Sequence, residues 1–423
     1  MIRLGALGLG LLASACTSNT VGTIRLKLTT APESAILDSI ATLRVTLTAP
    51  HQVIEEARTS TGFDFALEAD AHGEVGTVIV EGFDTAHVLV ATGSSPPFAA
   101  SPLDAAITVY VAPPLSIGRA PETLASPRTA IAAAPLAYGG ILVGGSLADA
   151  TASTAVEVYN AYNHSLAPGL ALPEARVLPA LATTAVGVVY IAGGTETSHV
   201  VRTFDTTVAP SGAYGTVGEA AVVGPSGTAV AIGTPSAPRF LVAAAAPYVF
   251  DATTVTARPD LPALHAAASV VTAAGERIAL VATPDGLARL RADALLPVAG
   301  TTGLPVVAIA ALSDGSFLAL LADRADVVRV DAETGVTTTI AGALSELRGM
   351  PSLAVTTRYV VIASATSADV LDATSLARVV TLPATMGQFA LALPNEQVLL
   401  GGALDGTPSD RLELFTPPPP PAP

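Results

Sequence analysis

The stretch ILVGGSLADATASTAVEVYN, residues 141–160, contains two short apolar segments separated by a loop of small and polar residues. The first segment is an apolar run that ends in two glycines, and the second alternates apolar and polar side chains before Asn160. Short runs of this kind, bounded by glycine and small polar residues, are typical of β-strands joined by turns. The same arrangement recurs along the chain, and the recurrence predicts the fold.

Two columns of strands repeat between residues 114 and 416. The first column is an apolar run ending in small residues: ILVGG (141–145), VYIAGG (189–194), FLVAA (240–244), IALVA (278–282), FLALLA (317–322), YVVIAS (359–364) and VLLGG (398–402). The second carries one large apolar residue, often followed by Asp or Asn and then Thr: Tyr159, Phe204, Phe250, Leu290, Val330, Leu371 and Phe415. Seven units of about 40–50 residues, all strand and turn, predict a seven-bladed β-propeller.

The first two units and the last resemble kelch repeats. VEVYN (156–160) is similar to the third kelch strand, and Arg128 and Arg176 match the arginine that opens the first. Three glycine pairs stand where kelch repeats have theirs: Gly144 and Gly145, Gly193 and Gly194, and Gly401 and Gly402. Units three to six have no glycine pair, and the chain has no tryptophan, which kelch repeats normally carry. A generic seven-bladed propeller therefore stays open beside the kelch-like one.

The two ends of the repeat region predict how the ring closes. The last unit stops after its third strand at Phe415, while residues 115–124 precede Arg128 without a unit of their own. We expect this segment to supply the fourth strand of the last blade, because closure in this way leaves no unpaired edge. Residues 417–423 are rich in proline, which cannot join a sheet, and predict an exposed extended tail.

Residues 23–113 alternate apolar and polar side chains with a period of two. Leu43, Val45 and Leu47, for example, would lie on one face of a strand. About six such runs, separated by clusters of Pro, Gly and Ser and without a helical pattern, predict a small immunoglobulin-like β-sandwich. We expect this domain to act as a spacer. The fold class is therefore all-β, with a β-sandwich followed by a seven-bladed kelch-like propeller.

Residues 1–22 predict where the protein resides. Arg3 is the only charge before Cys16, an apolar run follows it, and small residues precede the cysteine, as in a secretory signal. ASAC (13–16) resembles the bacterial lipobox, although that family usually has Leu where Ala13 stands. The resemblance implies a signal peptide of residues 1–15, a lipidated Cys16 with a short tether (16–22), and a membrane anchor in the cell envelope, with Thr17 favouring the outer membrane. A plain secreted protein with an incidental cysteine is the alternative.

Composition excludes several classes of function. The chain has 20 basic and 35 acidic residues, and a nucleic-acid-binding protein needs a basic surface. Cys16 is the only cysteine, so its lipidation leaves no thiol for a disulfide, a metal or a nucleophile. We expect no catalytic residues and no resident metal or cofactor. The histidines show no metal-ligand spacing and are interpreted as surface or loop residues: His51, His72, His87, His164, His199 and His265.

Acidic residues in the predicted loops between second and third strands are the candidate binding surface. In a propeller these loops emerge on the same face as the connections between blades, so their carboxylates would form an acidic ring over the channel. Such a ring would bind Ca²⁺ through carboxylate oxygens, or a basic segment of a partner. Asp is also a favoured turn residue, so ordinary solvated loops are the alternative. The candidates are Asp285, Asp323, Asp326, Asp369, Asp405 and Asp410.

Together these features predict a lipid-anchored envelope protein whose propeller binds another envelope protein or a glycan without catalysis. The enzymatic alternative is a kelch-type sugar-acid mutarotase (or a related epimerase), for which four residues that open first strands would face a funnel: Arg128, Arg176, His265 and Arg348. Alanine and threonine dominate those strands, which favours binding. A purely structural surface protein is the third hypothesis.

Overall fold

The computed structural model spans residues 1–423 and describes 21–59, 63, 67–70, 74–99, 105–195, 200–219, 228–234, 237–346, 351–384, 386–404 and 407–421. Nearly all of these residues lie in strands and turns, as the sequence predicts. One short helix, α1 (Ile36–Ser39), departs from that prediction. Within the described ranges, no helix is long and apolar enough to cross a membrane.

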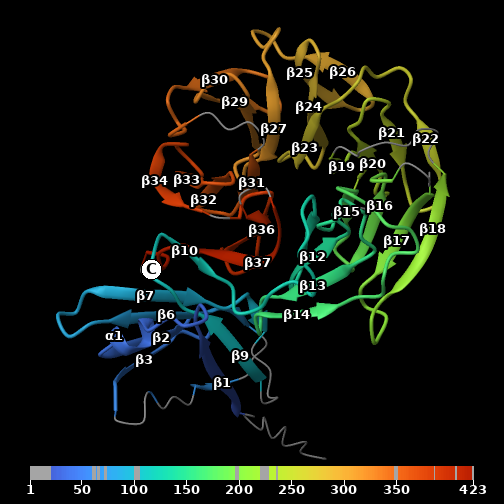
Figure 1. Ribbon diagram of the computed structural model, residues 1–423. Helices are drawn as coiled ribbons and strands as arrows, with labels where there is room; N and C mark the ends of the chain where they lie inside the picture. Colours follow the sequence, from blue (N-terminus) through green and yellow to red (C-terminus); the bar gives the residue numbers. More distant parts are fainter. Residues whose placement is uncertain are drawn as a thin grey trace, which may run out of the picture.

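A ring of four-stranded antiparallel sheets makes up the larger part of the molecule (Figure 1). Among the described residues, seven such sheets surround one centre (Figure 1). In six of them the strands follow one another in chain order from the centre outward, and the seventh ends in β10 from an earlier part of the chain. The first three sheets contain β11 (Ala132–Leu136), β12 (Gly139–Val143), β13 (Val156–Asn160) and β14 (Ser165–Pro168); β15 (Ala180–Thr183), β16 (Val188–Ala192), β17 (Val200–Asp205) and β18 (Ala213–Glu219); and β19 (Ala229–Ala231), β20 (Phe240–Val242), β21 (Tyr248–Phe250) and β22 (Val255–Ala257).

The next four sheets continue around the ring in chain order. They contain β23 (Ala266–Val271), β24 (Arg277–Thr283), β25 (Gly286–Arg291) and β26 (Ala294–Pro297); β27 (Val306–Ala311), β28 (Ser316–Leu321), β29 (Val327–Asp331) and β30 (Thr337–Ile340); β31 (Ser352–Val355), β32 (Tyr359–Ala363), β33 (Ser367–Asp372) and β34 (Arg378–Pro383); and β35 (Phe389–Ala392), β36 (Val398–Leu404), β37 (Thr407–Thr416) and β10 (Ser116–Arg119).

The last sheet closes the ring with a strand from the beginning of the repeat region. β10 pairs antiparallel with β37, and Ile117 lies opposite Phe415. The innermost strands complete the circle, because β11 contacts both β15 and β35. The predicted role of residues 115–124 is thereby confirmed.

The burial pattern explains why the two repeated columns are apolar. The second strand of a sheet is covered on both faces by the neighbouring sheets, and every residue of β12 and β28 is buried. The large residue of the third strand fills the space between sheets. Phe204, for example, packs in one cluster with Ile141 of the preceding sheet and Val189 of its own. Burial of one such side chain contributes roughly 2–3 kcal/mol.

The repeated Asp-then-Thr sequence forms the turn between third and fourth strands. An oxygen of each Asp accepts a hydrogen bond from a backbone N–H two or three residues later: Asp251 from Thr253 (2.7 Å), Asp331 from Thr334 (2.7 Å) and Asp372 from Ser375 (2.8 Å). These bonds hold the pKa values of the three carboxyl groups below their usual range. The acidic residues here therefore act as turn formers.

The N-terminal part consists of two larger sheets and a short strand pair. One sheet has the order β4 (Leu67–Asp70), β1 (Val21–Thr29) and β9 (Ala105–Tyr110), with β1 and β9 parallel. The other has the order β3 (Gln52–Ala57), β2 (Thr42–Leu47), β6 (Val78–Phe83) and β7 (Leu89–Ser94), and the pair is β5 (Val75–Gly76) and β8 (Phe98–Ala99). The two larger sheets share one apolar core, in which Leu43, Val45 and Leu47 meet Ile107 and Val109.

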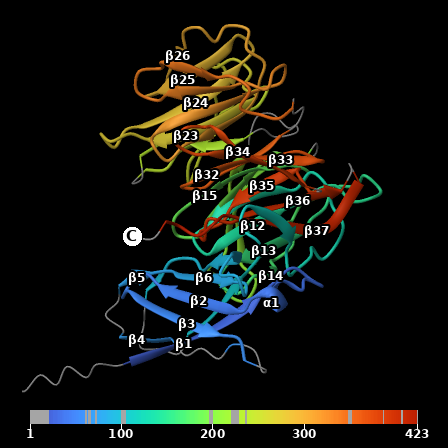
Figure 2. The same ribbon diagram turned by 90° about the vertical axis from the view of Figure 1, so that its left-hand side faces the viewer.

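The N-terminal part lies against one side of the ring (Figure 2), and a buried histidine joins the two. The backbone N–H of Tyr110, at the end of β9, donates to Nε2 of His164 (3.2 Å), and Nδ1 of the same ring lies 2.8 Å from the Tyr159 hydroxyl. Because Nε2 accepts, Nδ1 carries the proton and donates to Tyr159 in the neutral imidazole. His164 lies in the β13–β14 turn, which agrees with its interpretation as a surface or loop residue, but it is buried there because the N-terminal part covers it.

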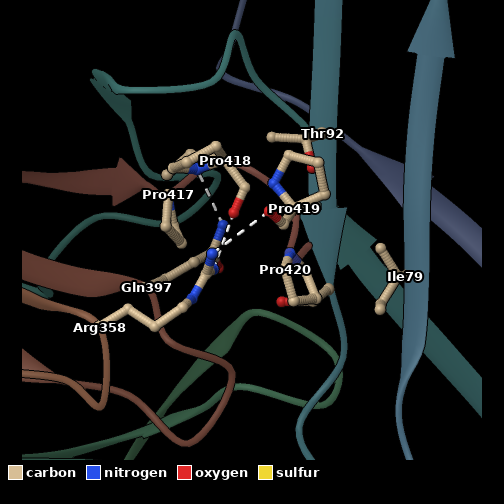
Figure 3. Close-up of a pocket in the computed structure, with 11 residues that line it drawn as sticks. Ile79, Thr92, Arg358, Gln397, Pro417, Pro418, Pro419 and Pro420 are labelled. Atoms are coloured by element: carbon tan, nitrogen blue, oxygen red, sulfur yellow. Dashed lines mark hydrogen bonds between the residues drawn. The ribbon is translucent and has the colours of Figure 1, made fainter. Parts of the chain in front are cut away.

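The first residues of the proline-rich tail lie against both parts of the molecule, while Pro420 and Pro421 are exposed as predicted (Figure 3). Pro417 is buried, and the guanidinium of Arg358 donates to the carbonyl oxygens of Pro418 (2.7 Å) and Pro419 (3.2 Å). Proline lacks an N–H group but keeps its carbonyl acceptor, so a tail that cannot join a sheet can still be held by a donor. The prediction of an exposed tail was wrong for these first residues.

Because His164 is buried between the N-terminal part and the ring, we expect the folded protein to lose stability in acid. Burial lowers the pKa of His164 to about 4, against about 6.5 in an unfolded chain. Between these values the unfolded state binds the proton and the folded state does not, so stability falls as pH falls from about 6.5 to 4, by up to about 3 kcal/mol. Urea unfolding of the wild type and of His164→Gln, measured at pH values from 7.5 to 4.5, checks this. The variant should show the shallower pH dependence, and identical slopes would contradict the assignment.

Candidate functional site

A cavity of about 850 Å³ opens at the centre of one face of the ring. Its wall is built by residues that precede or begin first strands, such as Leu178 before β15 and Val306 in β27, and by the β32–β33 loop with Ser364. This is the face on which second-to-third strand loops and sheet-to-sheet connections emerge. We call this cavity the channel mouth.

Small side chains on the innermost strands keep the channel mouth open. These strands read AAAPL, ALAT, AVA, AAASVV, VVAIAA, SLAV and FALA, so alanine dominates where the seven sheets converge. β27 is half-exposed along its whole length, as expected for a strand beside an open channel. Larger side chains at these positions would fill the space that the cavity occupies.

The polar groups of the channel mouth are few and uncharged apart from one imidazole. His265 is exposed there, with its backbone N–H donating to the carbonyl of Ala282 (3.0 Å). The side-chain oxygen of Gln388 accepts from the backbone N–H of Ala130 (2.7 Å), which ties the seventh sheet to the first. Of the described lining residues, His265 alone has a basic side chain, and none has an acidic one. The cavity therefore offers an apolar surface with scattered hydrogen-bonding groups.

The candidate Asp369 lies in a different place from the one the sequence suggests. It belongs to β33, is fully buried, and accepts hydrogen bonds from the backbone N–H of Ser345 (2.9 Å) and the hydroxyl of Thr381 (2.6 Å). Through these bonds, Asp369 ties the segment before β31, which contains Ser345, to β34, the outer strand of the same sheet. The prediction that Asp369 is an exposed loop ligand was wrong, because its strand begins two residues earlier than the sequence pattern indicates.

Four of the other acidic candidates are partly or fully exposed, and the side chains of two of these have partners. Asp323 forms an ion pair with Arg324 (2.9 Å), and Asp326 accepts from the backbone N–H of Gly342 (2.9 Å). Asp285 is exposed in the β24–β25 turn, and Asp410 is exposed within β37 rather than in a loop. Asp405 lies outside the described residues. In the part of the chain that the structure describes, no three His, Cys, Asp or Glu residues meet where they could hold a metal ion.

Arg128 and Arg176 are buried inside the sheets and do not face the channel mouth. Nη1 of Arg128 donates to the carbonyl of Gly144 (2.7 Å), and its Nη2 forms an ion pair with buried Glu157. Nη1 of Arg176 likewise donates to the carbonyl of Gly193 (2.7 Å). Both arginines therefore satisfy the carbonyls at the ends of second strands. Of the three described residues proposed for a funnel, only His265 lies at the mouth, and Arg348 is outside the described residues.

The glycine pairs have a structural role, as the sequence predicts. Gly144 (φ +65°) and Gly193 (φ +66°) adopt the left-handed backbone conformation in which glycine is strongly preferred. A Cβ on Gly144 would also collide with the carbonyl oxygen of Arg176, and one on Gly401 would meet the ring of Phe389. Positive φ values recur at the partners Gly145, Gly194 and Gly402.

Sequence reasoning missed most of the channel mouth. Leu178, Val306 and Gln388 are ordinary residues in the sequence, and only their shared position at the start of first strands could have identified them. The alanine content of those strands was visible, but it was interpreted as evidence against a catalytic funnel rather than as the cause of an open cavity.

No protein-family model and no curated protein matches the chain. Solved structures do match. Streptogramin B lyase aligns with a TM-score of 0.53 and 9% identity over 70% of this chain and 96% of that chain. YCF48 bound to a D1 peptide aligns with a TM-score of 0.51 and 13% identity over 73% and 97% of the two chains. Both are β-propeller proteins. The ring of this chain is a β-propeller. At these identities the likeness shows the fold alone.

The buried ion pair yields a stability prediction. Arg128→Met should lower the free energy of unfolding by about 3–5 kcal/mol, because it leaves the Glu157 carboxylate buried without its cation. Urea unfolding followed by circular dichroism measures the loss. The double variant Arg128→Met with Glu157→Gln removes both charges and should lose less. A single variant that is no less stable than the double one would show that the pair is not a coupled buried unit.

Proposed function

We propose that the protein is a lipid-anchored component of a bacterial cell envelope whose seven-bladed, kelch-like propeller is a non-catalytic interaction platform. The partner is another envelope protein, and it inserts an uncharged segment into the channel mouth. The observation that carries this proposal is the open cavity of about 850 Å³ at the hub of the ring. A glycan is the alternative partner.

The chemistry of the cavity favours an apolar segment of a protein. Leu178, Val306 and Pro351 contribute apolar wall, and each Å² of apolar surface removed from water contributes roughly 25 cal/mol. Gln388 and Thr366 add polar groups that can orient a peptide backbone. The structure of YCF48 was solved with a D1 peptide bound. We propose a peptide segment for this chain as well.

The acidic loops around the mouth play a secondary part in this proposal. Asp285 and Asp326 lie in second-to-third strand loops, on the face that carries the cavity. Their charges would attract a partner with basic residues beside its apolar segment and would accelerate the encounter. Ca²⁺ bound by these carboxylates remains a weaker part of the proposal, since the described residues do not gather three of them.

The N-terminal part would place the propeller near the membrane. We propose that its two larger sheets form an immunoglobulin-like β-sandwich, supported by the single core they share. β1 begins at Val21, so the tether after Cys16 spans at most about 20 Å when extended. The buried junction at His164 and Tyr110 would then hold the propeller at a fixed orientation to the sandwich.

A sugar-processing enzyme is the second candidate function. His265 favours it, because an exposed imidazole at the mouth of a cavity could act as an acid or base. Arg128 and Arg176 cannot assist from where they lie, since their guanidinium groups are engaged within the sheets. A purely structural surface protein would use neither the cavity nor the imidazole.

Blocking the channel mouth tests the platform. Ala365→Trp places a large side chain at the exposed lip of the cavity, and Ala274→Trp places the same side chain on the exposed β23–β24 hairpin of the opposite face. Crosslinking in envelope extract, followed by mass spectrometry, should recover a partner with the wild type and Ala274→Trp, and about tenfold less with Ala365→Trp. Equal recovery with both variants would contradict a partner at the mouth. Turnover of a sugar acid that only Ala365→Trp abolishes would support the enzyme instead.

Lipidation is tested separately. Cys16→Ser should abolish acylation and release the protein from the membrane fraction, because the thioether bond requires the thiol. Fractionation of cells followed by mass spectrometry of the mature N-terminus measures both effects. Retention of Cys16→Ser in the membrane fraction would contradict the lipid anchor. It would not test the proposal that the channel mouth binds a partner.

A further inference from the structure

A second cavity, of about 250 Å³, lies between the third and fourth sheets on the face opposite the channel mouth. Arg239, which precedes β20, and Arg277, the first residue of β24, line it together with Asp293 in the β25–β26 turn. The two sheets are in direct contact here, since β19 touches both β23 and β24. We call this space the Arg277 cavity.

The carboxylates around the Arg277 cavity are already paired with arginines. Asp293 accepts from Nη1 of Arg239 (3.0 Å) and from Nη1 of Arg258 (3.1 Å), and Arg239 and Arg258 hold the pKa of its carboxyl group below the usual range. Glu276, the chain neighbour of Arg277, forms a two-bond pair with Arg291 (2.6 and 2.8 Å). Neither carboxylate is therefore left to neutralise Arg277.

The backbone of Arg277 pairs with Val271 of β23, but its side chain has no hydrogen bond or ion pair to any described residue. Its side chain is half-buried, and its Nε is fully enclosed without a partner. Four other arginines have an enclosed, unpartnered Nε, but each forms a bond or ion pair through another guanidinium nitrogen: Arg128, Arg176, Arg289 and Arg411. Burying part of a cation without a partner is costly. A ligand that supplies the missing negative charge would offset that cost.

We propose that the Arg277 cavity binds a small oxyanion, as a carboxylate, sulfate or phosphate group on a molecule no larger than a monosaccharide. The planar guanidinium fork of Arg277 would bind two oxygens of the anion. Arg239 lies beside it and neutralises Asp293, the carboxylate that lines the cavity. Ile232 and Leu290 give apolar walls for the carbon skeleton of an organic anion. The volume of about 250 Å³ sets the upper size, since drug-sized ligands occupy roughly 300–1,000 Å³. This site is independent of the channel mouth.

The test is titration calorimetry of the full chain in detergent at low ionic strength, with inorganic phosphate, sodium sulfate and sodium glucuronate in separate experiments. At least one anion should bind with a stoichiometry of one. Arg277→Gln should weaken that binding by about tenfold to a hundredfold, because a charged hydrogen-bonding group is lost. Arg378→Gln removes an equal charge from an exposed site on β34 and should leave the affinity unchanged.

The relative affinities of the three anions identify the class of ligand. Tighter binding of glucuronate than of the inorganic ions would identify an organic acid as the ligand, and the reverse order would identify a free inorganic anion. Arg277→Lys keeps the charge without the fork and should bind with intermediate affinity, which provides the comparison if Arg277→Gln does not fold. No binding of any of the three anions, or equal affinities in the wild type, Arg277→Gln and Arg277→Lys, would overturn the proposal.

Discussion

The pairing of β10 with β37 is the interaction on which the rest of the structure depends. It joins the beginning of the repeat region to its end, so that Ile117 lies opposite Phe415 and the seventh sheet gains its fourth strand. Without it, β37 would expose an unpaired edge, and the first and last sheets would be held together by side-chain contacts and the backbone bridge between Arg128 and Ser409. Closure also forces seven first strands to meet around one axis. Crowded strands favour small side chains, which accounts for the alanines. These small side chains in turn leave the channel mouth open.

Closure also determines where the N-terminal part lies. β9 ends at Tyr110, a few residues before β10, so the strand that closes the ring brings the N-terminal sheets against the first and seventh sheets (Figures 1 and 2). His164 fills the contact on one side, and Ser94 exchanges hydrogen bonds with Asn395 (2.9 and 3.1 Å) on the other. The tail leaves β37 at the same place and is held there by Arg358. One pairing thus connects closure, domain orientation and the docking of the tail.

Much of the fold could be predicted from the sequence, because its strands repeat with a strong apolar pattern. The large residues Tyr159, Phe204, Phe250 and Phe415 are buried between sheets as expected, and the spare segment closes the ring. The failures concern residues whose environment is set by distant parts of the chain. Asp369 and Pro417 were assigned to the surface and His164 to the surface or a loop, yet each is covered by an element that local pattern does not reveal. Arg277 could not have been identified at all, since its lack of a partner depends on how Asp293 and Glu276 are paired.

Amide hydrogen exchange of the folded protein, resolved to peptides by mass spectrometry, tests ring closure most directly. Residues 413–416 of β37, which lie opposite β10, are compared with the central strand β36 and with the outer strand β22, which has an unpaired edge. If β10 pairs along β37, this part of β37 is bonded on both sides, and its amides should exchange only through the large-scale opening that exposes β36, with a similar protection. Exchange of residues 413–416 as rapid as that of the outer strand β22 would contradict closure by β10, and with it the account given of the channel mouth.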